Sequence, residues 1–183
     1  MIHFRFLFLL FYLQLASVCL QAGFMRLHLF IQNNGTSVIL RAGNTLTQRS
    51  MRTASNIATV KMDITYMADG QFAGLTHFST TSHSLFGIRQ ENGIRSLVYL
   101  SNGKDTVGIR VNGKSIWLRS TWDANGISRC VFSTDGKSYQ PFGSTYQMTW
   151  GSYRGDRIGI FNFNSKDDKG YVDVDWFRYD YGK

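Results

Sequence analysis

The chain has little of several residue types that define other classes of protein. Its 183 residues include one proline, two cysteines and a single glutamate, Glu91. So few cysteines exclude a disulfide-stabilised scaffold and a metal site built mainly from thiolates. Cys19 lies in an apolar N-terminal segment. Cys130 alternates with apolar neighbours in SRCVFS and is therefore expected to be a small core residue.

Runs of like charge, helical periodicity and familiar catalytic motifs are also missing. The net charge is +8, but lysine and arginine are scattered singly, so we expect no nucleic-acid partner. No window of eleven residues repeats apolar residues at a helical period. The GxSxG, HExxH, phosphate-loop and CxxC motifs are absent, and the four histidines form no ligand-spaced pair, so no cofactor is expected.

Residues 1–22 form an apolar leader that resembles a secretory signal peptide. Arg5 precedes an apolar run, and small residues follow it. If the leader is cleaved, residues 23–183 form a secreted or periplasmic module, whereas a retained leader would anchor the chain to a membrane. A start codon placed by accident upstream of a gene fragment is the remaining interpretation.

The rest of the chain shows the period-two alternation of half-buried β-strands. In GYVDVDWFRYDY, for example, Val172, Val174 and Trp176 alternate with Asp173, Asp175 and Phe177. This pattern predicts eleven strands, at residues 24–31, 38–41, 59–67, 72–78, 85–90, 94–100, 106–111, 115–122, 127–133, 157–163 and 170–179.

Five Asn-Gly or Asp-Gly pairs punctuate these strands, mostly about ten residues apart. They end at Gly93, Gly103, Gly113, Gly126 and Gly136. Such pairs supply the positive φ angles that tight hairpin turns require. The spacing therefore predicts a meander of antiparallel strands, folded into one sandwich or barrel.

Acidic residues give one candidate catalytic or metal site. Sandwich glycosidases of the retaining type place two carboxylates about 5–5.5 Å apart. Asp173 and Asp175 lie two positions apart on an expected strand, so both are expected on the same face. With Glu91 they are the candidates for an autonomous glycosidase, and by themselves for a structural calcium site. The other interpretation is a polar face bonded to backbone or arginine.

Aromatic residues make up 15% of the chain and give a second set of candidates. Flat rings that suit stacking on sugars are found at Trp117, Trp122, Trp150, Tyr153 and Trp176. Most aromatic residues on strands belong to the core, and we expect this of Trp176 and Phe161. Trp150 and Tyr153 lie in the loop WGSYRGDR and are therefore stronger functional candidates.

Several motifs resemble the C-terminal concanavalin A-like module of glycoside hydrolase family 43, which includes β-xylosidases and α-L-arabinofuranosidases. They are GFMRL (23–27), NTLTQR (44–49), TVKMDITYMADGQFAGLTHF (59–78), YQMTWGSYRGDRIGIFNFN (146–164) and GYVDVDWFRYDY (170–181). The resemblance implies an all-β, antiparallel concanavalin A-like (jelly-roll) sandwich. The family's module usually opens with one more strand before GFMRL, so this sandwich is expected to lack its first strand and to expose an edge.

The resemblance also implies where function lies. In the family, three catalytic carboxylates lie on a five-bladed propeller that precedes this module, so no catalytic residue is expected here. A sandwich loop of xylosidase-type members places an aromatic residue, more often Phe, at the propeller's substrate pocket. Tyr153 matches it, with Arg154 and Trp150 nearby. The implied function is a non-catalytic module that docks to a propeller or binds xylan-type polysaccharide. A fragment without activity and an autonomous glycosidase are the alternatives.

Overall fold

The computed structural model describes residues 25–27, 46–101, 103–150 and 155–182. The expected leader (1–22), the expected strand at 38–41, and Tyr153 and Arg154 lie outside these ranges. Every regular element in the described ranges is a β-strand, which confirms the all-β prediction. Within the same ranges there is no helix of the length and apolarity that crossing a membrane requires.

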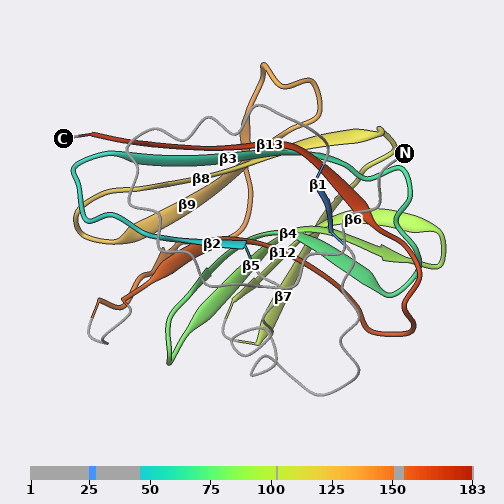
Figure 1. Ribbon diagram of the computed structural model, residues 1–183, viewed down its shortest axis with the longest axis horizontal. Helices are drawn as coiled ribbons and strands as arrows, with labels where there is room; N and C mark the ends of the chain where they lie inside the picture. Colours follow the sequence, from blue (N-terminus) through green and yellow to red (C-terminus); the bar gives the residue numbers. More distant parts are fainter. Residues whose placement is uncertain (1–24, 28–45, 102, 151–154, 183) are drawn as a thin grey trace.

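The strands form two antiparallel sheets that face each other as layers (Figure 1). The seven-stranded sheet has the order β1 (Met25–Leu27), β13 (Val172–Tyr181), β3 (Asn56–Asp63), β8 (Ser115–Trp122), β9 (Ile127–Ser133), β10 (Gln140–Pro141), and β11 (Tyr146–Gln147) also pairs with β9. The six-stranded sheet has the order β2 (Leu46–Arg49), β12 (Arg157–Asn164), β4 (Gln71–Phe78), β5 (His83–Glu91), β6 (Ile94–Ser101), β7 (Lys104–Arg110).

Glycine turns join neighbouring strands within each sheet, as predicted, with one difference. Gly93, Gly103, Gly126 and Gly136 have φ angles of 73° to 75°. Gly113 has no positive φ, because the segment between β7 and β8 is not a hairpin: it crosses from the six-stranded to the seven-stranded sheet. The prediction of a hairpin turn is therefore wrong at this position.

The main core lies between the two sheets and follows the alternation of the strands. On β8, Ile116, Leu118 and Trp122 are buried, whereas Trp117 and Arg119 face the outside of the sandwich and are partly exposed. Residues from both sheets complete this core: Val60, Met62, Ala73, Leu75, Phe86, Ile88, Leu97, Tyr99, Phe132, Ile160, Val172 and Val174. Burial of these apolar side chains is the main force that holds the layers together.

Cys130 and Phe161 are both buried, as predicted. Burial in the inter-sheet core raises the pKa of the Cys130 thiol to about 12. Phe161 belongs to a separate apolar cluster with residues of β4, β5 and β6. Its neighbour Ile160 takes the inward position on β12, so strand alternation turns Phe161 to the opposite face of the sheet.

Strand β13 contains an irregularity that contradicts one core prediction. Its pairing with β3 shifts register between Val174 and Trp176, which leaves Asp175 as an extra residue. The extra residue reverses the alternation, so Phe177 packs against the core while Trp176 stays partly exposed. The prediction that Trp176 is a core residue is therefore wrong.

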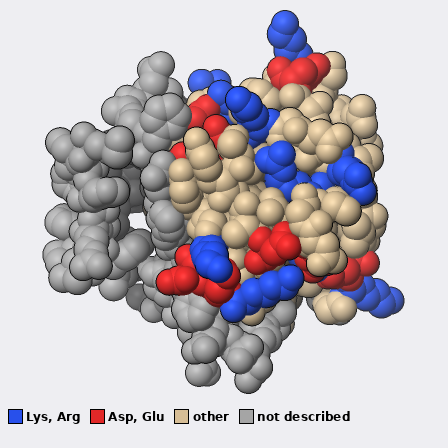
Figure 2. All heavy atoms as spheres, turned by 90° about the vertical axis from the view of Figure 1, so that its right-hand side faces the viewer, with Lys and Arg blue, Asp and Glu red and all other residues tan. Residues whose placement is uncertain are grey.

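Charged side chains of both signs are interspersed on the face shown in Figure 2. Elsewhere in the described residues, opposite charges also meet in ion pairs, such as Arg89 Nη1 and Asp105 Oδ2 at 2.6 Å. On this face the positive side chains are therefore mixed with negative ones rather than gathered in one patch.

Candidate functional site

The loop that the sequence singles out has well-defined residues at both ends. Trp150, at the N-terminal end, packs against an apolar cluster that includes Trp122 and Ile158. The guanidinium carbon of Arg52 lies 5.7 Å from the centroid of the Trp150 ring. Contacts with this cluster and with the Arg52 cation hold the indole in place.

A buried hydrogen-bond network holds the C-terminal end of the loop, at Asp156. Nδ1 of His77 lies 3.3 Å from Oδ1 of Asp156, and the Tyr146 hydroxyl donates to Oδ2 at 3.0 Å. Nε2 of His77 lies 2.8 Å from Oγ of Ser120, which belongs to the other sheet. Burial, and then the charge of Asp156, raise the pKa of Tyr146, so its hydroxyl stays a protonated donor.

Ser120, His77 and Asp156 are linked through side-chain contacts in the same order as the serine, histidine and aspartate of a serine-hydrolase triad. Catalysis by such a triad requires that the substrate can reach the serine. Their exposed fractions are 1%, 2% and 0%. The network is therefore structural: it links the two sheets and fixes Asp156. The partners of His77 lie 43 and 79 positions away in the chain, and no local pattern in the sequence indicates them.

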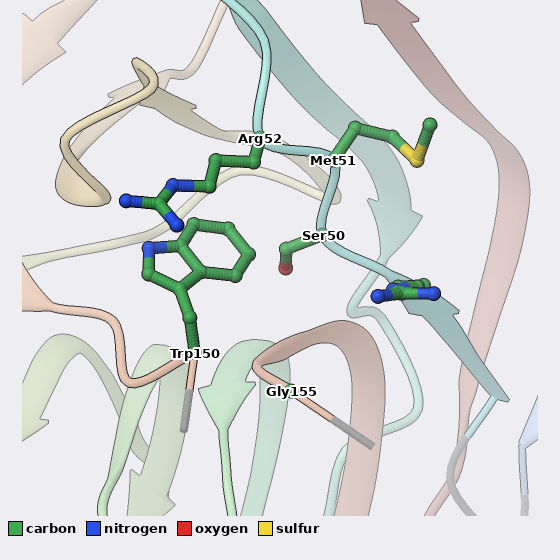
Figure 3. Close-up of a pocket in the computed structure, with 6 residues that line it drawn as sticks. Ser50, Met51, Arg52, Trp150 and Gly155 are labelled. Carbon is green, nitrogen blue, oxygen red and sulfur yellow. The ribbon is translucent and has the colours of Figure 1, made fainter. Parts of the chain in front are cut away.

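A surface hollow of about 320 Å³ adjoins the loop. Its lining comprises Arg49, Ser50, Met51, Arg52, Trp150 and Gly155. Figure 3 shows Arg52 extending over the Trp150 indole and the Ser50 hydroxyl directed toward the space beside that ring. The Ser50 oxygen is buried and has no hydrogen-bond partner among the described residues. The sequence prediction found Trp150 but missed the residues that follow β2.

Asp156 also joins the two walls of the hollow. Its backbone oxygen accepts a hydrogen bond from the backbone N–H of Ser50 at 3.1 Å. Gly155, the residue before it, lines the opposite wall and has a φ of 61°, a conformation that glycine adopts without strain. The buried network therefore sets the position of the hollow as well as the end of the loop.

The acidic candidates do not come together. Asp173 and Asp175 lie on β13 of the seven-stranded sheet, whereas Glu91 ends β5 of the six-stranded sheet, where its side chain is 61% exposed. Asp175 forms an ion pair with Lys61, which agrees with the polar-face interpretation. In the described part of the chain, no group of three or more His, Cys, Asp or Glu side chains could hold a metal ion.

Two facing antiparallel sheets with the core between them define this protein as a concanavalin A-like β-sandwich. Residues 14–180 match the family described as the β-xylosidase C-terminal concanavalin A-like domain, and the chain belongs to this family. This confirms the resemblance to glycoside hydrolase family 43 and the predicted fold.

Individual relatives agree with this assignment. The chain is 37% identical over 154 residues to a β-xylosidase of Formosa agariphila; the match covers 81% of this chain and 25% of the relative. The chain therefore spans about a quarter of the curated relative's length.

Solved structures establish the same fold. A bifunctional GH43-CE protein of Bacteroides eggerthii superposes with a TM-score of 0.77 at 23% identity, over 87% of this chain and 21% of that chain. A GH43 glycoside hydrolase engineered to display endo-xylanase and exo-arabinofuranosidase activity superposes with a TM-score of 0.73 at 24% identity, over 91% of this chain and 36% of that chain. The GH43 protein BlXynB of Bacillus licheniformis superposes with a TM-score of 0.69 at 22% identity, over 87% of this chain and 33% of that chain.

Proposed function

We propose that the chain serves as the accessory module of a family 43 glycoside hydrolase and completes the substrate pocket of a catalytic propeller. In this proposal Tyr153 closes the pocket, with Arg154 and Trp150 beside it, and the propeller supplies the catalytic carboxylates. An aromatic residue at the mouth of a pocket excludes water and shapes the site for the sugar.

The observation that carries this proposal is the fixed frame around the loop. Trp150 and Asp156 are held by buried contacts at its two ends, and an open hollow adjoins it. Rigid support on both sides is what a residue that contributes to another domain's pocket requires. The match to a β-xylosidase of about four times the matched length gives further support.

Complementation tests the proposed function. The chain alone is expected to release no product from aryl-xyloside or aryl-arabinofuranoside substrates, because the proposal assigns it no catalytic carboxylate. The chain is then mixed with the Formosa agariphila β-xylosidase expressed without its matching region, and kcat/KM is expected to rise with chain concentration until it saturates. Turnover by the chain alone, well above a blank, would contradict the proposal, and so would an unchanged kcat/KM.

Direct binding of xylan-type polysaccharide is a second candidate function, favoured by the outer face of the seven-stranded sheet. Trp176, Lys61 and Trp117 lie opposite one another on β13, β3 and β8, so their side chains share this face. Lys61 Nζ lies 5.4 Å from the Trp117 ring centroid. Two strand spacings of ~4.8 Å separate the indoles by roughly 10 Å, a distance that two stacked sugar units of one chain can span.

Affinity electrophoresis checks this second candidate. Xylan in the gel is expected to retard the wild-type chain. Trp117→Ala or Trp176→Ala is expected to remove most of the retardation, because a sugar unit can no longer stack on the indole ring that is lost. Tyr66→Ala is the matched control, since Tyr66 is exposed but lies outside this row. Equal mobility of the wild type with and without xylan would exclude binding by this face.

A further inference from the structure

The hollow beside Trp150 has the chemistry of an anion site. Two of its lining residues, Arg49 and Arg52, carry guanidinium groups, and none carries a carboxylate. No ion pair joins either arginine to a carboxylate of the described residues. Arg52 Nε donates to the backbone oxygen of Ala124 at 3.3 Å, which orients the guanidinium and leaves its terminal nitrogens available.

Ser50 provides independent evidence for a ligand. Ser50 is 1% exposed, and its hydroxyl is directed toward the hollow (Figure 3) and has no hydrogen-bond partner in the part of the chain that the structure describes. A buried hydroxyl without a partner is costly, and such groups in folded proteins are normally satisfied. A ligand with acceptor oxygens that entered the hollow would satisfy it.

The other residues that line the hollow indicate the kind of molecule that bears the anionic group. Trp150 and Met51 offer apolar surface, and the indole is flat, as the apolar face of a pyranose ring requires. A volume of about 320 Å³ accommodates one monosaccharide with ordered water. Guanidinium groups form paired hydrogen bonds with the planar oxygens of a carboxylate, as they also do with phosphate.

We propose that this hollow binds a uronic acid, a pyranose that carries a carboxylate, and that the module thereby recognises acidic groups on the polysaccharide. The carboxylate pairs with Arg49 and Arg52, the Ser50 hydroxyl donates to one of its oxygens, and the ring rests against Trp150. This inference rests on the proposed function in one respect: a hollow beside the loop places the acidic group near the pocket that Tyr153 closes.

Titration of the chain alone with sodium glucuronate tests the inference, followed by NMR of the tryptophan indole N–H signals. The Trp150 signal, assigned with Trp150→Phe, is expected to shift and saturate with a roughly millimolar Kd. Glucose at the same concentration should give no saturable shift, and acetate a clearly weaker affinity. Added NaCl should weaken glucuronate binding, since it screens the charges.

Variants identify the residues that bind the carboxylate. Arg49→Gln and Arg52→Gln are each expected to raise the glucuronate Kd about tenfold or more, because each loses a charge-assisted hydrogen bond. Arg110→Gln is the matched control: Arg110 is exposed on β7, at the edge of the six-stranded sheet opposite β2, and its loss should leave Kd unchanged.

Ser50→Ala separates a ligand contact from a structural role. It is expected to raise Kd about fivefold while the melting temperature stays equal or rises, because the hydroxyl bonds to none of the described groups in the unliganded fold. Absence of binding, equal affinity for glucose, or acetate binding as tightly as glucuronate would each overturn the inference. The last result would mean that the hollow recognises a carboxylate without a sugar ring, such as an acidic side chain of a docked protein. Because the assay contains no propeller, its failure would leave the complementation result standing.

Discussion

Replacing Asp156 with alanine is expected to lower the free energy of unfolding by about 3 to 5 kcal/mol. The carboxyl group of Asp156 is fully buried and accepts from the Tyr146 hydroxyl, while His77 approaches its other oxygen. Alanine removes the carboxylate from both partners: His77 loses its contact at Nδ1, and Tyr146 keeps only the Ser82 hydroxyl, 2.8 Å away. Urea unfolding of the wild type and the variant, followed by tryptophan fluorescence, measures the difference.

Two further variants test this explanation of the Asp156 effect. Asp180→Ala removes an exposed aspartate on β13 and should change the free energy of unfolding by less than about 0.5 kcal/mol. Asp156→Asn keeps one acceptor oxygen, so its loss should lie between those of alanine and the wild type. If Asp156→Ala unfolded at the same urea concentration as the wild type, the network would not hold the end of the loop.

Replacing Gly87 with alanine is expected to lower the free energy of unfolding by about 3 kcal/mol or more. Gly87 and Gly74 lie directly opposite each other on β5 and β4. A Cβ atom on Gly87 would lie 1.9 Å from the backbone oxygen of Ala73, and one on Gly74 would lie 2.1 Å from that of Phe86. Because the obstacles are backbone atoms, no change of rotamer relieves the clash and the two strands must separate.

Gly113→Ala is the matched control for this glycine pair. Gly113 has no positive φ, and its nearest contact for an added Cβ atom is an ordinary 3.6 Å, to the Ser115 oxygen. The substitution should be neutral or stabilise by up to about 1 kcal/mol through the unfolded state. A soluble Gly87→Ala protein with the wild-type melting temperature would show that β4 and β5 tolerate a wider spacing.

Local patterns in the sequence predict most of the described strands because alternation and turn chemistry are local properties. The segment from β4 to β9 follows them closely, apart from the crossing near Gly113, whereas the short strands β10 and β11 are not predicted. The exception on β13 has a physical cause that alternation does not contain. One extra residue, Asp175, lets Phe177 enter the core in place of Trp176.

The candidate site could be predicted only in part, for a similar reason. Trp150 stands out as an aromatic residue in a loop, and the family motif indicates Tyr153. The hollow, however, joins Trp150 to Ser50, which lies 100 positions earlier, and Asp156 meets His77 across 79 positions. These contacts depend on which strands become neighbours, so only the folded chain brings the residues together.

Steady-state kinetics of the complemented β-xylosidase test the central claim, that Tyr153 completes a propeller's pocket. With Tyr153→Ala, kcat/KM is expected to fall at least about tenfold at saturating chain, because the pocket loses the aromatic group that orients the sugar and excludes water. Tyr153→Phe should retain most of the activity, and neither variant should change the melting temperature of the isolated chain. Equal kcat/KM for the wild type and Tyr153→Ala, at saturating concentrations of both, would contradict the account.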